Sequence, residues 1–357
     1  MQGSDIEFET TQFLDPSGQL KQPLPDGLAG RDQLVDLYRI MLQTRLFDRA
    51  AINLQRTGAM GTYPSGEGQE AIGAGVGLAM RDDDVLVPYY RDIATQIQRG
   101  VLLEEILRYW GGDEWGSHFK HQSEDFPISV PIATQSCHAV GVAYALKYRR
   151  QARAVVTTCG DGATSKGDFY ESINIAGAMK LPVVFVINNN RWAISVPLEL
   201  QTAAPTIAHK ALAAGIPGHR VDGNDAIAVY QAVNDALAAA RDRHQPSLVE
   251  ALTYRLGDHT TADDASRYRD RAELESAREL EPLIRFKIYL QQEHSWSDAD
   301  DEALRGECQA QIKRAVENYQ AFPEQRPGEF FDYMFARPTG DLERQKREWL
   351  DEVKRHG

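Results

Sequence analysis

The sequence has few cysteines, no excess of basic residues and no long apolar run. The three cysteines, Cys137, Cys159 and Cys308, are an odd number without metal-binding or redox spacing, which is typical of reduced thiols in a cytosol. Lys and Arg total 39 against 52 Asp and Glu, a net charge of −13 that argues against binding to nucleic acid or to an anionic membrane surface. No apolar run approaches the roughly 20 residues of a membrane-spanning helix. The N-terminus has the pattern of neither a secretory signal nor a transit peptide, so we expect a cytoplasmic protein.

The composition is that of a globular protein, with 42% hydrophobic and 25% charged residues in 357. Residues 1–30 are rich in Pro and Gly near their end and have no sustained periodicity, which predicts an extended arm. We expect an α/β domain over 31–325. A charged, helical tail is predicted over 326–357, after a connection near 323–340.

Apolar patterns predict alternating strands and helices in the middle of the chain. Strands are predicted at 154–159, 182–187 and 247–254, and helices at 32–56, 168–180, 224–242 and 271–293. The order strand, helix, strand within about 35 residues is typical of a βαβ crossover, which makes the two strands parallel and the connection right-handed. The sequence therefore predicts an α/β fold, a parallel sheet with helices on both faces.

A glycine-dense segment, GEGQEAIGAGVG at 66–77, has two interpretations. It can be fitted to a dinucleotide-binding fingerprint, but that motif requires a preceding strand and none is predicted. Small residues that let two helices pack closely are the favoured interpretation.

Polar residues follow two of the predicted strands. Asp161 follows the first and Asn190 follows the next, 29 residues later. In parallel sheets ligands bind outside the carboxyl ends of strands, so these side chains should converge if the strands are close neighbours. A carboxylate and an amide oxygen suit Mg²⁺ that carries a diphosphate. Gly162 would allow a sharp turn, although an ordinary Asp-Gly turn explains the same residues.

The segment GDGATSKGDFYESINIAGAMKLPVVFVINNN at 160–190 resembles the thiamin diphosphate motif. Its detail is similar to the alpha chain of the decarboxylating component of 2-oxoacid dehydrogenase complexes, over about 31–355. The resemblance implies the thiamin diphosphate-binding fold, with Mg²⁺ held by Asp161, Asn190 and the backbone carbonyl of Trp192. The family usually has Tyr or Phe at that last position. It also implies cofactor contacts from Gly162 and Ala163.

Two further segments fit the same family. VPYYRD at 87–92 is similar to a segment whose tyrosine and arginine, here Tyr90 and Arg91, reach the diphosphate. The loop at 254–269 resembles one whose histidine lies over the cofactor. This implies His259 as a catalytic residue that binds the diphosphate and donates a proton during transfer to lipoyl, supported by Arg255 and Tyr268.

The segment ISVPIATQ at 128–135 resembles the part of the family that surrounds the aminopyrimidine ring. Ile132 would prop the two rings of the cofactor together, although simple core packing also explains an isoleucine there. Related branched-chain enzymes have a K⁺ site here, and the resemblance implies Ser129, Pro131, Thr134 and Gln135 as its ligands.

The resemblance implies a subunit that is active only in an α₂β₂ heterotetramer. The beta subunit would supply the activating glutamate and half of the pocket, and a lipoyl acyltransferase core would accept the product. Segments 167–177 and 201–218 are most similar to bacterial pyruvate dehydrogenases, whereas 128–135 and 189–195 are similar to branched-chain 2-oxoacid enzymes. A non-catalytic scaffold subunit is a third possibility, against which the intact Asp161, Asn190, Arg91 and His259 argue.

Overall fold

The centre of the fold is a six-stranded sheet whose neighbouring strands all run parallel. The computed structural model describes residues 6–323 and 326–356, so the first five residues of the expected arm and the expected boundary at 325 lie outside the described part. The strands in spatial order are β1 (Thr10–Thr11), β7 (Gly218–Asp222), β8 (Ser247–Leu252), β4 (Val183–Asn189), β3 (Val155–Gly160) and β2 (Val85–Val87).

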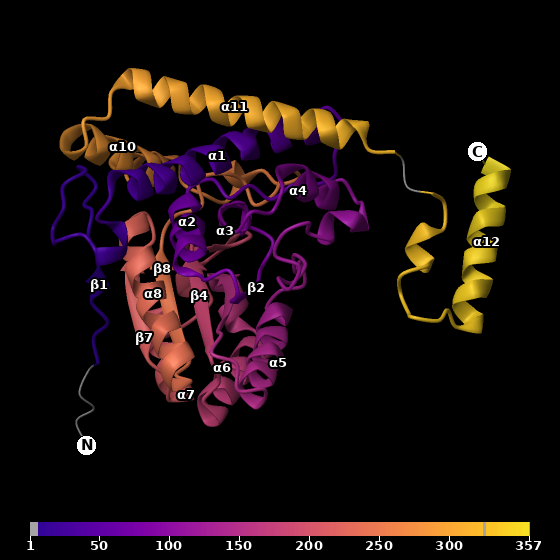
Figure 1. Cartoon of the computed structure of the whole chain (residues 1–357), viewed down its shortest axis with the longest axis horizontal. Helices are drawn as coiled ribbons and strands as arrows, with labels where there is room; N and C mark the ends of the chain where they lie inside the picture. Colours follow the sequence, from indigo (N-terminus) through magenta and orange to yellow (C-terminus); the bar gives the residue numbers. More distant parts are fainter. Residues whose placement is uncertain (1–5, 324–325, 357) are drawn as a thin grey trace.

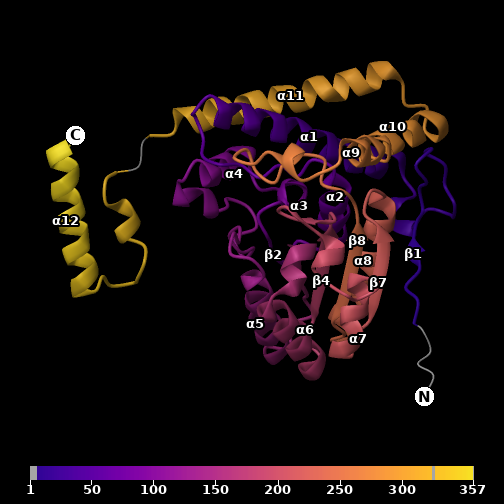
Figure 2. The ribbon, with the colours of Figure 1, turned by 180° about the vertical axis from the view of Figure 1, so that it is seen from behind.

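Helices cover both faces of this sheet (Figures 1 and 2), which confirms the predicted fold class. Alternate strand residues join different hydrophobic clusters: Val155 and Val183 belong to one, and Val156 and Val184 to the other. Since successive side chains of a strand point to opposite faces, the two clusters lie on opposite sides. One contains α5 (Thr134–Tyr148), α6 (Gly167–Met179) and α7 (Lys210–Ala214); the other contains α1 (Arg31–Arg56), α2 (Glu70–Ala79), α3 (Ile93–Gln98), α4 (Leu103–Trp110) and α8 (Ala226–Arg243).

The direction of chain growth explains why both faces are covered. From β2 through β3 to β4 the chain moves one way across the sheet, whereas from β7 to β8 it moves the opposite way. Right-handed crossovers in opposite directions place their helices on opposite faces. The predicted βαβ unit is confirmed as β3, α6 and β4, with β3 and β4 adjacent. The strands β1, β2 and β7 were not predicted, because they are short or lack a β-branched run.

The glycine-dense segment belongs to a helix interface. Its glycines lie in α2, which follows a loop and not a strand. An added Cβ would lie 2.6 Å from Ala94 at Gly73 and 2.9 Å from the backbone of α8 at Gly75. Close helix packing is therefore confirmed, and the dinucleotide interpretation is wrong.

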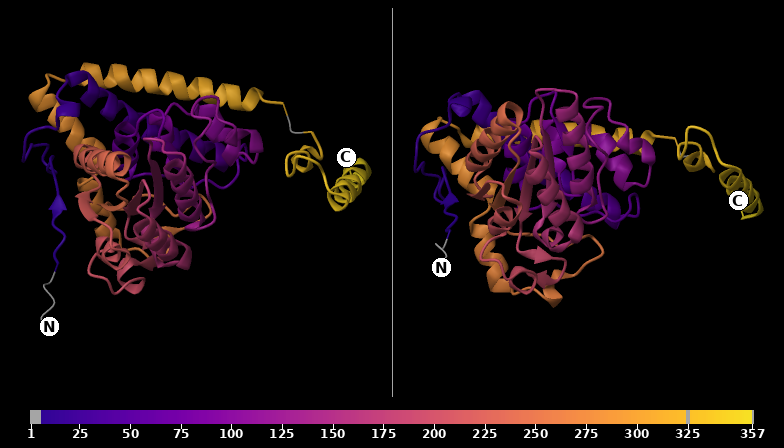
Figure 3. Two further views of the ribbon diagram at one scale, coloured as in Figure 1. Left: turned by 60° about the horizontal axis from the view of Figure 1, so that its bottom comes forward. Right: turned by 90° about the horizontal axis from the view of Figure 1, so that it is seen from below.

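The C-terminal third departs most from the sequence prediction. The stretch predicted as helical over 271–293 is two helices, α9 (Arg271–Glu279) and α10 (Pro282–Glu293), separated where Pro282 starts the second. The long helix α11 (Asp298–Ala321) was not predicted; it lies along α1 in Figures 1 and 3, where Tyr38 donates to Asp301 at 2.8 Å.

The two ends of the chain lie outside the main body of helices. The tail helix α12 (Gly340–His356) stands apart in Figures 1 and 2, close to its predicted start at Asp341. The N-terminal arm carries β1, and its backbone amides at Phe13 and Leu14 donate to Asp225 at 2.6 and 2.7 Å. No helix in the described residues is long and apolar enough to cross a membrane.

Candidate functional site

The predicted site residues on β3 and β4 lie at neighbouring strand ends. Gly160 pairs in register with Asn188, so Asp161 and Asn190 leave the sheet side by side. Both are buried and line one cavity of about 220 Å³ at the carboxyl edge of the sheet. This is the position at which ligands bind in open parallel sheets.

Asp161 is buried with an oxygen that has no partner. Gln201 donates to Oδ2 at 3.1 Å, whereas Oδ1 has no hydrogen-bond partner among the described residues. Burial raises the pKa of Asp161 to about 6, although hydrogen bonds from Gln201 and from the backbone amide of Asn190 oppose this rise. A buried carboxylate oxygen with no partner is costly to keep, and a bound cation would stabilise it.

Gly162 is required for the turn that holds Asp161. A Cβ at Gly162 would lie 2.6 Å from the Cβ of Ala193, so a side chain here would separate the Asp161 turn from the short hairpin that carries Trp192. That hairpin consists of β5 (Trp192–Ala193) and β6 (Val196–Pro197). One turn of 3-10 helix, Asp161–Ser165, precedes α6, which starts at Gly167 rather than directly after Asp161.

Three non-glycine residues with left-handed backbone lie at or beside the cavity. Ala133, Arg191 and Ile194 have φ values of 66°, 68° and 56°. This conformation is unfavourable for residues with a Cβ and is found preferentially at functional sites. Here it allows tight turns before α5 and around Trp192.

Asn190 is held by residues that the sequence analysis missed. Its Nδ2 donates to Oε1 of Gln69, the residue just before α2, at 3.2 Å, and its Oδ1 accepts from the amide of Trp192 at 3.2 Å. The hydroxyl of Tyr89 completes this network, because it donates to the same Gln69 oxygen and accepts from Asn188. No local sequence pattern indicates such a contact.

Lys210 is a second residue that the sequence analysis missed. It is buried and its Nζ donates to the carbonyl and hydroxyl oxygens of Thr164, at 2.8 and 2.9 Å. Thr164 in turn donates to the backbone oxygen of Asp161 at 2.7 Å. The turn after β3 is therefore anchored from α7, 46 residues further along the chain.

His259 and Arg91 are in direct contact at the cavity. Nη2 of Arg91 lies 2.9 Å from Nδ1 and 2.7 Å from the carbonyl oxygen of His259. A guanidinium only donates, so Nδ1 accepts and the imidazole proton is on Nε2. Burial, followed by the charges of Arg91 and Arg255, lowers the pKa of His259 to about 4, and Asp263 opposes this. The imidazole is therefore neutral at pH 7. Tyr90 also lines the cavity, with its ring edge-to-face to His259.

Arg255 lies behind the cavity and is not among the residues that line it. It is buried and donates to the carbonyl of Trp192 at 3.4 Å, to that of Ile194 at 2.8 Å and to the hydroxyl of Tyr268 at 2.8 Å. Tyr268 donates to Asp263, which also accepts from the amide of His259. Arg255 thus links the Trp192 hairpin to the His259 loop.

The segment 128–135 forms another wall of the cavity. Ser129, Pro131, Ile132 and Gln135 line it, whereas Thr134 does not. Ile132 is 41% exposed, which excludes core packing within this chain. Gln135 donates to the carbonyl of Thr158 at 2.9 Å and leaves its Oε1 buried without a partner in the described part of the chain.

The oxygen atoms at the strand ends fit a hard cation. A carboxylate, a carboxamide and a backbone carbonyl are donors that suit Mg²⁺. The structure places Asp161, Asn190 and Trp192 on one cavity, and an Asp161 oxygen is free to accept a cation. The described residues contain no group of three or more His, Cys, Asp or Glu suited to a metal, but this donor set does not require one.

Comparison with known proteins gives a consistent result. The dehydrogenase E1 component family matches residues 38–328. The chain is 38% identical to a 3-methyl-2-oxobutanoate dehydrogenase subunit alpha of Mycobacterium tuberculosis, over 98% of this chain and 96% of the relative. It is 37% identical to the pyruvate dehydrogenase E1 component subunit alpha of Mycoplasma genitalium, over 94% of each chain. The Bacillus subtilis subunit of the same name is 37% identical, over 94% of this chain and 91% of the relative.

Proposed function

The chain belongs to the dehydrogenase E1 component family, and on this premise we propose that it is the alpha subunit of a pyruvate dehydrogenase. The reaction would be the oxidative decarboxylation of pyruvate with transfer of the acetyl group to a lipoyl disulfide. The family depends on thiamin diphosphate. The observation that carries the proposal is the single cavity that gathers Asp161, Asn190, Arg91 and His259.

We propose distinct roles for these residues. Asp161, Asn190 and the Trp192 carbonyl would hold Mg²⁺, and Arg91 and Tyr90, with Gly162 and Ala163, would contact the diphosphate. Bound thiamin diphosphate supplies the electron sink for loss of CO₂. His259 would hold a proton on Nε2 at the cavity, and a nearby phosphate charge would raise the pKa of its imidazole toward the neutral range. That change would make it a better proton donor. Ser129, Pro131, Thr134 and Gln135 would form a K⁺ site.

The cavity supports the proposal of a shared active site. Asp161 is the only acidic side chain among the described residues that line it, so the activating glutamate would come from a beta subunit. Its 220 Å³ is smaller than the roughly 300–1,000 Å³ of complete ligand pockets. Val130, Ile132 and Ile194 are exposed apolar residues at or beside it, as expected where another subunit completes the pocket.

We propose an α₂β₂ assembly that works with a lipoyl acyltransferase core in the bacterial cytoplasm. The arm over 1–30 and the tail over 326–357 are proposed as segments distinct from the cofactor-binding domain. The test is steady-state kinetics of this chain with and without the beta subunit, on pyruvate and on 2-oxoisovalerate. Turnover of pyruvate only by the pair is expected. Turnover by this chain alone would refute the shared site.

A second candidate substrate is a branched-chain 2-oxoacid. The Mycobacterium tuberculosis relative named for 3-methyl-2-oxobutanoate is as similar as the pyruvate enzymes and covers 98% of this chain. A kcat/KM that is higher for 2-oxoisovalerate than for pyruvate would favour this alternative. No thiamin diphosphate binding by the pair, measured by calorimetry with Mg²⁺, would instead favour a scaffold subunit.

A further inference from the structure

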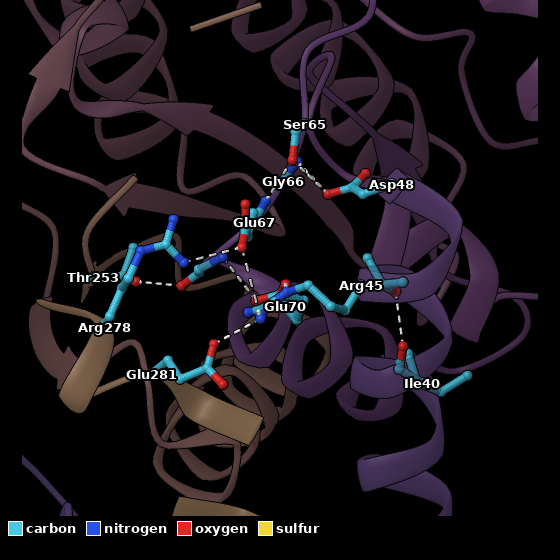
Figure 4. Close-up of polar contacts among 12 residues, drawn as sticks. Ile40, Arg45, Asp48, Ser65, Gly66, Glu67, Glu70, Thr253, Arg278 and Glu281 are labelled. Atoms are coloured by element: carbon cyan, nitrogen blue, oxygen red, sulfur yellow. Dashed lines mark hydrogen bonds and ion pairs between the residues drawn. The ribbon is translucent and has the colours of Figure 1, made fainter. Parts of the chain in front are cut away.

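Asp48 is a buried carboxylate outside the cavity whose hydrogen bonds all go to one loop. It lies on α1 and is 1% exposed. Its Oδ1 accepts from the hydroxyl of Tyr63, and its Oδ2 accepts from the hydroxyl of Ser65 and the amide of Gly66, both at 2.8 Å. Figure 4 shows this contact between Asp48 and the loop. The loop over residues 63–66 is therefore fixed by three donors that converge on one side chain.

The same loop contacts the His259 segment by two routes. In the first, the carbonyl of Ser65 accepts from Nη1 of Arg91 at 2.6 Å, and Arg91 binds His259 through Nη2. In the second, Tyr63 and Thr261 are joined by two hydrogen bonds: the amide of Thr261 donates to the Tyr63 carbonyl at 2.9 Å, and the amide of Tyr63 donates to the Thr261 hydroxyl at 3.1 Å.

We propose that Asp48 is a positioning residue for His259. By holding the loop over 63–66, it fixes the carbonyl that orients Arg91, and Arg91 in turn keeps the His259 proton on Nε2. Asp48 does not line the cavity, so it acts only through other residues. This inference depends on the proposed function, in which His259 is the catalytic residue.

The environment of Asp48 is an expensive one for a carboxylate. Burial raises the pKa of Asp48 to about 7, even though the hydrogen bonds from Tyr63, Ser65 and Gly66 lower it. Simple packing between α1 and the loop would be served better by an apolar side chain, which carries no such desolvation penalty. Three directed hydrogen bonds instead fix where the loop lies.

The opposite end of the same loop is held separately, which offers a contrast. Arg45, one turn earlier on α1, pairs with Glu70 and with Glu281, and Glu70 accepts from the amide of Gly68 at 2.9 Å (Figure 4). These contacts fix the start of α2. They do not reach Arg91 or His259, so the link to the imidazole belongs to the Asp48 end.

The test compares two substitutions of Asp48 in the complex with the beta subunit. Asp48→Ala removes the acceptor for all three donors. In Asp48→Asn the amide oxygen can accept from Ser65 and Gly66, and the amide nitrogen can donate to the Tyr63 hydroxyl, so the loop keeps its place. We expect kcat to fall about 100-fold in Asp48→Ala with little change in KM, and to stay within about threefold in Asp48→Asn, because small misplacements of a catalytic group have effects of this size.

A second measurement does not depend on activity. Hydrogen exchange of the amides over 259–263 should become faster in Asp48→Ala and remain unchanged in Asp48→Asn. The matched control is Asp225→Ala, which removes an equally buried carboxylate that accepts backbone amides of the arm and of α8. It should leave exchange over 259–263 and kcat unchanged. If Asp48→Ala does not assemble, the double variant Tyr63→Phe, Ser65→Ala removes two of the three donors and should show the same effects in weaker form.

Three outcomes would overturn the inference. They are unchanged exchange over 259–263 in Asp48→Ala, equal losses in Asp48→Ala and Asp225→Ala, and an Asp48→Asn variant as impaired as Asp48→Ala. Absence of turnover by the unmodified complex would refute the proposed function instead. The exchange experiment would still decide whether Asp48 holds the His259 loop.

Discussion

Replacing Asp161 by Asn should stabilise the metal-free protein. Burial raises the pKa of Asp161 from 3.8 to about 6, so the folded state binds its proton more tightly than the unfolded state does. The free energy of unfolding therefore falls as pH rises from about 4 to about 6. The difference of 6 − 3.8 = 2.2 pH units corresponds to about 3 kcal/mol. Asn carries no charge, so Asp161→Asn should be more stable by up to this amount at pH 8 and no more stable below pH 4.

The same substitution should remove the response to ligands. Wild-type protein with Mg²⁺ and thiamin diphosphate at 100 times the dissociation constant should gain about 2.7 kcal/mol. Asp161→Asn lacks the negative oxygen that would hold the cation and should gain nothing. The substitution would thus raise the stability of the metal-free protein and abolish its stabilisation by ligand.

The assay is thermal unfolding of the complex at pH 8 with and without both ligands, together with calorimetric titration of the cofactor. Asp168→Asn is the matched control, because Asp168 lies on the same segment, is partly exposed and pairs with Lys166 at 2.9 Å. It should change neither quantity. The reasoning would be refuted by an Asp161→Asn protein that is less stable than wild type without metal, or that keeps its ligand-dependent stabilisation.

Three other substitutions test separate parts of the structure. Gln69→Ala removes the partner of the Asn190 amide and should weaken Mg²⁺ binding about 10-fold by calorimetry, as is typical when a residue that orients a metal ligand is lost. Asp225 has its pKa raised by burial to about 6, so Asp225→Asn should abolish a fall of about 3 kcal/mol in unfolding free energy between pH 4 and 6, measured by urea titration at several pH values. Gly75→Val would force a side chain against α8 and should cost about 2 kcal/mol in thermal unfolding, whereas Gly306→Ala on α11 has open space and should stabilise by about 0.5–1 kcal/mol.

The sequence alone predicted the parts of the fold that depend on local pattern. The β-branched runs over 154–159 and 182–187 identified β3 and β4, because such runs rarely occur outside buried strands. The spacing between Asp161 and Asn190 then placed both at one edge of the sheet, since parallel strands end on the same side. The periodicity of 32–56 predicted α1 to within one residue at its start, and its end at Arg56.

Only the tertiary structure decided how the site residues are held. Gln69 reaches Asn190 across 121 positions of sequence, Asp48 acts on His259 through two intervening residues, and Lys210 anchors the turn that follows β3. None of these contacts leaves a local signal, because a buried polar side chain on a helix has the same sequence pattern whichever partner it meets. The partner is set when distant segments pack together and each buried donor or acceptor must be satisfied.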